Sequence, residues 1–345
     1  MNVSLSLNGL GEIPLVPIAD LNGNKKYAVE EVECRNKLAA LYRLIDHFHW
    51  SQSIYNHITF RLPGNDNEIL INPLGMLYRE ITASSFAKIS LDGRVIDPGS
   101  SPLGINQAGY ILHSAIHGAR RDVSCVLHLH TASAAAVSAM KCGLLPIIQE
   151  AMILGPVAYH EYRGVLADVQ EKKEIVKSLG DKKVLMLRNH GFASCGTSIE
   201  EAFHLAYETI VACETQVAAI RTGDLRKNLV LPKESAVAHA YQIAKHGANG
   251  MNRTAVPQLN GKMEHTFERL GDICWGVGEL EWEAWMRQLD GAGYQTGHKY
   301  KLPVLMDAIT KRKTNKIKRL RYGQKKHFQH NGLQHSLRAS LYNLQ

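Results

Sequence analysis

Hydrophobic residues recur at helical spacing along several stretches of the chain. In Val29–Trp50, Leu38, Leu41 and Ile45 fall on one face, and glutamates occupy the first turn. An apolar stripe with this period predicts an amphipathic helix packed on a core. Thr197–Glu201 has the pattern of a capping box and predicts the start of a long helix. Similar patterns predict helices at 108–120, 132–140, 168–179, 197–220, 237–246 and 279–290.

Short apolar runs bounded by glycine, proline or asparagine predict the strands. They lie at 54–61, 68–72, 86–90, 126–131, 157–162, 184–187 and 192–195. Asp92-Gly93 follows the third run and predicts a hairpin, because Asp-Gly tolerates the positive φ of a tight turn. Strands and helices alternate irregularly and the hairpin is antiparallel. The pattern therefore predicts an α/β domain of three layers, α/β/α, around a mixed and largely antiparallel central sheet.

Composition divides the chain into an arm, a head and a tail. Residues 1–27 contain prolines and little periodicity, which predicts an extended arm. The head is expected at 28–303, with a polar insertion at 222–276. The net charge is +8, but residues 311–345 hold ten Lys and Arg and no acid, which leaves 30 basic and 32 acidic residues elsewhere. The basicity therefore belongs to the tail, 304–345, which binds anionic surfaces by charge or stays a solvated extension.

Several classes of protein find no support in the sequence. The N-terminus has no basic-then-apolar leader pattern, and no apolar run approaches the roughly 18 residues that span a bilayer. Six scattered cysteines without a CxxC pair indicate reduced thiols of a cytosolic protein. Neither a G-x-G-x-x-G motif nor a P-loop occurs, so nucleotide binding has no support.

Two histidines alternate within the apolar run at 126–131. Because side chains of a strand alternate between its faces, His128 and His130 project from the same side. A third histidine, His190, lies where another apolar run gives way to a turn. Three imidazoles of this kind are suitable ligands for one metal ion. The alternatives are hydrogen-bonded histidines in a residual pocket, and metal occupancy without turnover.

Two further groups of residues are candidates for chemistry. His113 and His117 lie four residues apart on one helix face, which suits either a metal pair or satisfied polar contacts. Glu150 follows Pro146 at the start of a helical turn. It is a candidate base, or else a solvated or capping carboxylate.

Longer stretches of the sequence resemble the class II aldolase/adducin family. The H-x-H run, the small-residue helix after it, the Arg-Asn-His-Gly turn and the capped long helix carry the resemblance. Segments that match the adducin branch are 41–46, 50–52, 55–59, 104–110, 113–117, 136–146, 211–214, 278–284 and 289–297. The resemblance covers roughly 13–225 and 275–303 and implies a class II aldolase-like fold.

The resemblance also implies roles for single positions. In the aldolases of this family three histidines hold a zinc ion, and a glutamate one helix earlier moves the proton. The ligand positions match His128, His130 and His190. The glutamate position falls on Gly109, and Gln107 and Ala108 stand where phosphate-binding serines are usual.

The two phosphate loops of the family are also incomplete. They keep Asn56 and Gly75, while Ile58 and Leu74 replace the usual hydroxyl residues. Together with Gly109 and His113, the retained positions outline a residual pocket. No catalytic residue and no cofactor are expected there.

The resemblance implies a non-catalytic cytoskeletal head that self-associates and promotes the association of spectrin with actin filaments. Its partners would be actin, spectrin and other adducin-like chains, in homo- or hetero-oligomers, with anionic lipid as a further partner of the tail. The expected location is the cytoplasmic face of the plasma membrane. Nucleic acid binding has only charge in its favour. The alternative is a metal-dependent class II aldolase-type lyase, or an iron-dependent oxygenase, that uses zinc or iron at the three histidines.

Overall fold

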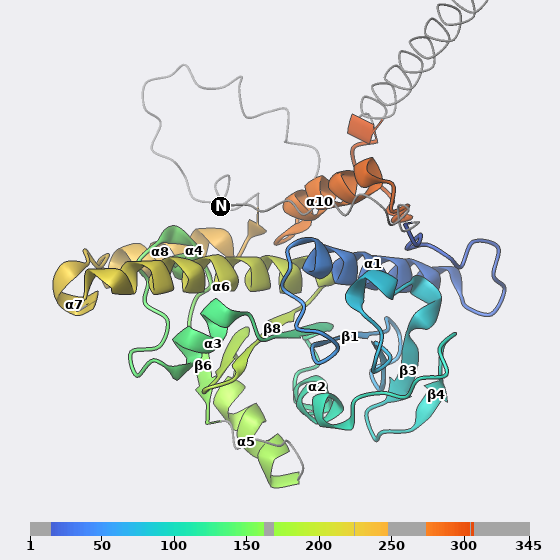
Figure 1. The fold of residues 1–345 in the computed structure, drawn as a ribbon, viewed down its shortest axis with the longest axis horizontal. Coiled ribbons are helices and arrows are strands. Elements are labelled where there is room, and N and C mark those ends of the chain that lie inside the picture. Colours follow the sequence, from blue (N-terminus) through green and yellow to red (C-terminus); the bar gives the residue numbers. More distant parts are fainter. Residues whose placement is uncertain (1–14, 162–168, 224, 248–273, 304, 307–345) are drawn as a thin grey trace, which may run out of the picture. The chain divides into compact units, whose positions relative to one another are not determined.

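A mixed sheet forms the middle layer of the computed structural model, which describes residues 15–161, 169–223, 225–247, 274–303 and 305–306 (Figure 1). The eight strands run in the order β4-β3-β2-β1-β5-β8-β7-β6. They are β1 (His57–Arg61), β2 (Glu68–Ile71), β3 (Ala87–Ser90), β4 (Val95–Asp97), β5 (Cys125–Leu129), β6 (Val157–His160), β7 (Val184–Leu187) and β8 (Gly191–Gly196). Neighbouring strands are antiparallel except β6 and β7. The predicted mixed, largely antiparallel sheet is therefore confirmed.

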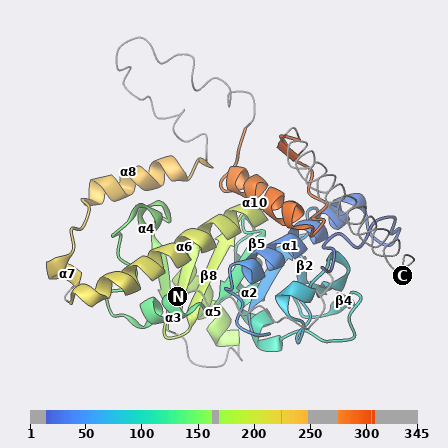
Figure 2. The same ribbon diagram turned by 45° about the horizontal axis from the view of Figure 1, so that its top comes forward.

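Helices cover both faces of this sheet. They are α1 (Val29–His47), α2 (Gln107–Ala119), α3 (Ala132–Ala139), α4 (Gln149–Ile153), α5 (Val169–Leu179), α6 (Ile199–Ala219), α7 (Leu225–Asn228), α8 (Glu234–Ala244) and α10 (Glu279–Ala292), with the 3-10 helices η1 (Tyr78–Glu80), η2 (Ala83–Ser85) and η3 (Ile220–Thr222). Figures 1 and 2 show α1 and α6 along one face and α2 and α5 along the other. The three predicted layers, α/β/α, are present.

Amphipathic helices bury their apolar stripes on the sheet. On one face, Leu112 and Ile116 of α2 and Ile175 of α5 pack against Val126 of β5. All five residues of β5 are buried, because helices cover both of its faces. A strand that is apolar on both sides belongs in the middle of a sheet. This central position places the end of β5 beside the ends of β1 and β8.

The predicted elements differ from the observed ones mainly at their ends. α1 stops at His47 rather than Trp50, because His49 adopts a positive φ of 57° that a helix does not allow. α8 begins at Glu234, three residues before the predicted helix. The helical turn expected at Glu150 is the short helix α4, whereas α7 was not predicted, since four residues carry too little periodicity.

The capping box of α6 is present in a slightly extended form. Ser198 Oγ accepts a hydrogen bond from the Glu201 backbone N–H at 3.1 Å. The Glu201 carboxylate reaches back to the backbone N–H of Thr197 at 2.7 Å. The first interaction satisfies a backbone donor that a helix start leaves without a partner, and the second ties the residue before the N-cap to the first turn. They fix where the longest described helix begins, directly after β8.

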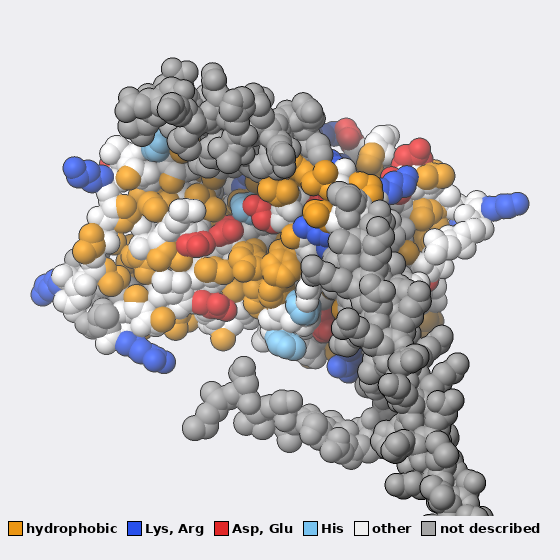
Figure 3. Space-filling model, turned by 90° about the horizontal axis from the view of Figure 1, so that it is seen from above, with side chains coloured by type: hydrophobic (Ala, Val, Ile, Leu, Met, Phe, Trp, Pro, Cys, Tyr) orange, Lys and Arg blue, Asp and Glu red, His pale blue; other side chains and the backbone are white. Residues whose placement is uncertain are grey.

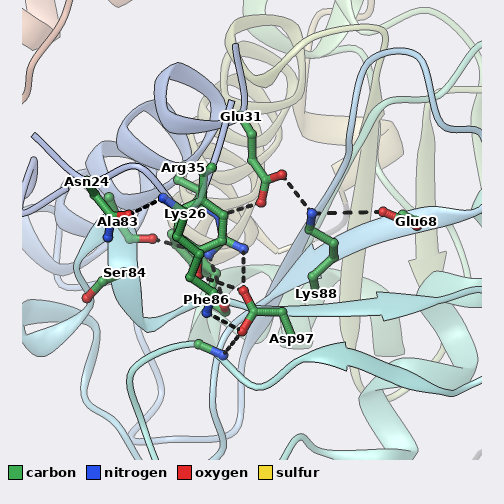
Figure 4. A network of polar contacts seen from close by, with 12 residues as sticks. Asn24, Lys26, Glu31, Arg35, Glu68, Ala83, Ser84, Phe86, Lys88 and Asp97 are labelled. Carbon is green, nitrogen blue, oxygen red and sulfur yellow. Dashed lines mark hydrogen bonds and ion pairs between the residues drawn. The ribbon is translucent and has the colours of Figure 1, made fainter. Parts of the chain in front are cut away.

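A polar network ties the N-terminal arm to α1 and to the sheet edge (Figure 4). The fully buried Arg35 donates to Glu31 Oε1 at 2.9 Å and to the Phe86 carbonyl at 3.0 Å. Asp97 of β4 accepts from Lys26 Nζ at 2.8 Å and from the Tyr27 hydroxyl at 2.7 Å. The network joins segments that lie 70 residues apart in the chain.

The chain divides into two compact units, 1–298 and 299–345. Within the first, the described part of the arm, 15–27, has no helix or strand, but its Ile18 is fully buried. The polar insertion predicted at 222–276 contains α7 and α8, and its residues 248–273 lie outside the described ranges. The predicted tail lies outside them too, apart from residues 305–306. None of the described helices is both long and apolar enough to cross a membrane.

Candidate functional site

Three histidines meet at one end of the central strands. His128 is on β5, His130 follows the end of that strand, and His190 lies in the turn between β7 and β8. Because β5 and β8 are antiparallel neighbours, the turn returns to the place where β5 ends. Asn189 makes this possible with a positive φ of 56°, which asparagine tolerates better than most residues.

The imidazole rings of these histidines are close together. Ring centroids lie 4.4 Å apart for His128 and His130, 4.1 Å for His130 and His190, and 5.3 Å for His128 and His190. One ring nitrogen from each histidine lies within 4.8 Å of the other two. His128 is 4 % exposed, and the other two are partly exposed. The cluster is thus open on one side and buried on the other.

Hydrogen bonds determine which nitrogen of each ring faces the cluster. His128 Nδ1 lies 2.8 Å from the Phe192 carbonyl oxygen, and His130 Nδ1 lies 2.8 Å from Gln52 Oε1. Both partners are acceptors, so each Nδ1 carries the proton and each Nε2 keeps a lone pair. The two Nε2 atoms face each other at 2.6 Å. Two lone pairs at this distance repel unless a cation or a proton lies between them.

The donor set fits a divalent metal ion. Burial, together with the His190 ring, lowers the pKa of His130 to about 4, and burial also lowers the pKa of His190 and of His128. Neutral imidazole with its second nitrogen on an acceptor is the form that ligates zinc or iron in proteins. The three side chains therefore offer a preorganised ligand set at neutral pH.

A fourth histidine lies behind this cluster. His57 of β1 is the direct register partner of His128, and their rings are parallel within 10° at a centroid distance of 6.3 Å. His57 is 5 % exposed, and neither ring nitrogen has a hydrogen-bond partner among the described residues. Burial, together with the His190 ring, lowers its pKa to about 4. His57 is therefore a neutral, buried imidazole at the inner wall of the site.

The His57 ring occupies the space beside Gly109. A Cβ atom on Gly109 would lie 2.5 Å from both Nδ1 and Cε1 of this ring. Real contacts of a Cβ atom are essentially never shorter than 3.0 Å, so any larger residue at 109 requires the ring to move. The space that a side chain at 109 would need, where the resemblance expects the carboxylate, is thus filled by an imidazole from strand β1.

His113 and His117 make polar contacts with one hydroxyl group. Thr59 Oγ1 lies 2.7 Å from His113 Nδ1 and 2.9 Å from His117 Nε2. Burial lowers the pKa of both rings, that of His117 to about 3 with help from the Arg61 charge. The structure therefore favours satisfied polar contacts over a metal pair. His113 Nε2 has no hydrogen-bond partner within the described ranges.

The remaining predicted residues differ in how they relate to the three histidines. Asn56 is fully buried, and its Oδ1 accepts the Gln52 backbone N–H at 2.5 Å, which connects it to His130. Gly75, with a φ of 100°, faces the Leu103 side chain. Glu150 lies on α4, where its charge acts on Glu208 of α6. The partly buried Glu150 thus faces a second carboxylate, and its role as a base stays a prediction.

Sequence reasoning did not assign roles to Gln52 and His57. Both belong to segments that carry the resemblance, but their chemistry depends on contacts with strand β5 and helix α2. Hydrogen bonding by Gln52 to His130 spans 78 residues. No local pattern in the sequence indicates a contact over that separation.

A family model and individual related proteins both assign the chain to one family. The model of the Class II Aldolase and Adducin N-terminal domain matches residues 36–217. The chain is 48 % identical to Adducin-related protein 1 of Caenorhabditis elegans, over 84 % of the chain and 37 % of that protein. It is 46 % identical to alpha-adducin of Rattus norvegicus, over 90 % of the chain and 40 % of that protein. The chain thus spans about two fifths of the length of these relatives.

Solved structures of related proteins have the same fold. An aldolase II superfamily protein from Pseudomonas syringae is 39 % identical, with a TM-score of 0.65, over 79 % of this chain and 97 % of that chain. L-fuculose 1-phosphate aldolase from Glaciozyma antarctica PI12 is 27 % identical, with a TM-score of 0.56, over 66 % of this chain and 88 % of that chain. The architecture described above is therefore that of class II aldolases.

Proposed function

Because the chain belongs to the class II aldolase and adducin family, we propose that it acts as an adducin-type head without catalytic activity. In this proposal it self-associates, as a homo- or hetero-oligomer with other adducin-like chains, and promotes the association of spectrin with actin filaments. Its place is the membrane skeleton, at the cytoplasmic face of the plasma membrane. The division into an arm (1–27), a head (28–303) and a basic tail (304–345) that contacts anionic lipid is part of the same proposal.

The packing of His57 against Gly109 is the observation that supports a non-catalytic head. The aldolase reaction that the resemblance implies needs a carboxylate at position 109 to move a proton. Glycine at this position offers no side chain, and the His57 ring fills the space that one would need. Proton transfer at this position is thereby lost, while the surrounding fold is retained.

Cosedimentation tests the proposed activity directly. The purified chain is mixed with actin filaments and spectrin, and the spectrin that pellets with the filaments is measured against an albumin control. We expect more spectrin in the pellet when the chain is present. Equal amounts with the chain and with albumin, both with residues 304–345 and after their removal, would contradict the proposal. Sedimentation velocity of the same sample measures self-association.

A second candidate function rests on the three-histidine cluster. Hydrogen bonds to Phe192 and Gln52 leave the Nε2 lone pairs of His128 and His130 facing the centre. A bound zinc ion would supply Lewis-acid chemistry, and iron would supply redox chemistry. The chain's own contribution would be to hold and orient the metal ligands, His190 included. This candidate is a metal-dependent lyase or oxygenase.

Metal analysis tests the second candidate. Protein purified without chelator is assayed for zinc and iron, together with a variant in which His128 and His130 are replaced by alanine. The second candidate expects near-stoichiometric metal in the unaltered chain and its loss in the variant. Metal content that is negligible, or equal in both proteins, would leave only the non-catalytic head.

A further inference from the structure

Four aromatic side chains, just after α1 and on α6 and α10, form a continuous ledge. Phe48 and Trp50 are stacked at a ring-centroid distance of 4.5 Å and an interplanar angle of 16°. Tyr207 of α6 lies 5.7 Å from Trp50, and Trp285 of α10 lies 4.9 Å from Phe48, both edge to face. All four side chains are partly exposed. We refer to Phe48, Trp50, Tyr207 and Trp285 as the aromatic ledge.

The ledge rests on a rigid base. Beneath it lie the buried Phe203 and Trp282, which are 3 % and 1 % exposed and are themselves in edge-to-face contact. At its rim, His49 has a positive φ of 57°, which ends α1 and turns the chain toward Trp50. Rings held in place by a buried layer lose little conformational entropy when they bind a partner.

Three carboxylates lie on helices that carry the ledge or pack against it. Glu150 is on α4, Glu208 follows Tyr207 on α6, and Glu281 precedes Trp285 by one turn of α10. Within the described ranges none of the three forms an ion pair with a lysine or arginine; Glu208 lies 3.9 Å from His204 Nδ1. In the face that Figure 3 shows, acidic side chains lie beside a gathering of hydrophobic ones.

The charges of Glu150 and Glu281 act on Glu208. Burial is the largest cause that raises the pKa of Glu208 to about 7, and the charges of Glu150 and Glu281 raise it further. The groups that face Glu208 are thus two carboxylates and the His204 imidazole. Acidic groups left without a cation next to apolar rings make a surface that a positively charged, partly apolar partner would stabilise.

We propose that the aromatic ledge and Glu150, Glu208 and Glu281 form a docking surface for a lysine-rich amphipathic helix of a partner protein. The apolar side of such a helix covers the four rings, and its lysines reach the three carboxylates. Lysine ammonium groups also bind well over tryptophan faces, of which the ledge has two. In this binding mode the apolar side of the helix lies on the rings, and the lysines along the edge of the helix pair with the carboxylates.

A synthetic peptide tests this surface on the full chain. The probe is a fluorescent amphipathic peptide of leucine and lysine, and its counterpart replaces every lysine by glutamate. Fluorescence anisotropy is expected to show saturable binding of the lysine peptide only. At pH 8, where Glu208 is ionised, the combined substitution Glu150→Gln, Glu208→Gln and Glu281→Gln is expected to weaken binding by about tenfold or more, because three partly exposed charge pairs are lost.

Matched variants control for net charge and for folding. Glu30→Gln, Asp92→Asn and Asp181→Asn remove three exposed charges elsewhere and should leave binding unchanged. Trp50→Ala tests the ledge, with the 57 % exposed Tyr55→Ala as its control, and circular dichroism confirms the fold of each variant. Equal losses in test and control variants, or equal binding of both peptides, would overturn the proposal. So would a change in oligomeric mass with Trp50→Ala and no effect on the peptide, which would make the ledge a contact between copies.

Discussion

The imidazole of His57 lies where a side chain on residue 109 would have to be. Glycine at 109 and histidine at 57 are therefore coupled, although 52 positions separate them in the sequence. His57 comes from β1 and Gly109 from the first turn of α2, and the His57 ring lies next to His128 of the three-histidine cluster. Restoring a carboxylate at 109 would need a smaller residue at 57 as well.

Substitution of Gly109 by alanine is expected to destabilise the fold. In a helix, alanine is favoured over glycine by about 0.5–1 kcal/mol. Overpacking a buried site costs about 1–3 kcal/mol, and the added Cβ would lie 2.5 Å from the His57 ring. The clash should outweigh the propensity gain, so Gly109→Ala should lower the free energy of unfolding by about 1 kcal/mol. Urea denaturation measures this difference.

A double-mutant cycle identifies the clash as the cause. Once His57→Ala has removed the ring, Gly109→Ala should become neutral or stabilising, which gives a favourable coupling energy. Gly118→Ala, on the same helix and with no atom within 4 Å of the added Cβ, is the matched control and should not destabilise. A cost at 109 that persists in the His57→Ala background would show that the two residues are not coupled.

Gln52 is expected to control the affinity of the histidine cluster for metal. Its side-chain oxygen holds the proton on Nδ1 of His130, so that Nε2 remains available. Losing a hydrogen bond of this kind typically costs about tenfold or more in metal affinity. Gln52→Ala should therefore weaken zinc binding, measured by competition with a chromophoric chelator. Gln107→Ala, which removes an exposed glutamine at the start of α2, serves as the control. Equal affinities for both variants would remove the assigned role of Gln52.

The sequence predicts those parts of the site that depend on local geometry. Strand alternation places His128 and His130 on one side, and both apolar runs that lead to the cluster are strands. The rest depends on pairing across the sheet. His57 reaches Gly109 only because β1 pairs with β5 in one register, and a shift by one residue would turn the ring to the other face. Periodicity along the chain contains no information about that register.

The aromatic ledge is a second feature that periodicity along the chain does not predict. Helical periodicity predicts α1, α6 and α10, and it places apolar residues on their buried sides. Phe48, Tyr207 and Trp285 come from three different segments, and their contacts depend on how the helices pack together. Their meeting is therefore a property of the tertiary structure alone.

The ionised Glu208 is expected to destabilise the fold at and above neutral pH. Its pKa is raised from 4.5 to about 7, mainly by burial, so the folded state binds the proton more tightly than the unfolded state. Stability should therefore fall as the pH rises from about 4.5 to 7. Glu208→Gln should raise the melting temperature at pH 8 relative to the unaltered chain and have little effect at pH 5. The exposed Glu214→Gln on the same helix should show no such difference. Identical pH profiles for the two variants would contradict the assignment.

Asp97 is expected to have the opposite dependence. Burial opposes its charge, but hydrogen bonds from Lys26, Tyr27 and the Gly99 backbone outweigh burial and lower its pKa from 3.8 to about 2. A lowered pKa contributes stability that is present above pH 4 and is lost as the pH falls toward 2. Asp97→Asn should therefore cost about 2 kcal/mol at pH 7, and less at pH 2.5. The fully exposed Asp181→Asn is the control, because its side chain lies outside this network. A cost of Asp97→Asn that does not change with pH would mean that shape rather than charge holds the arm in place.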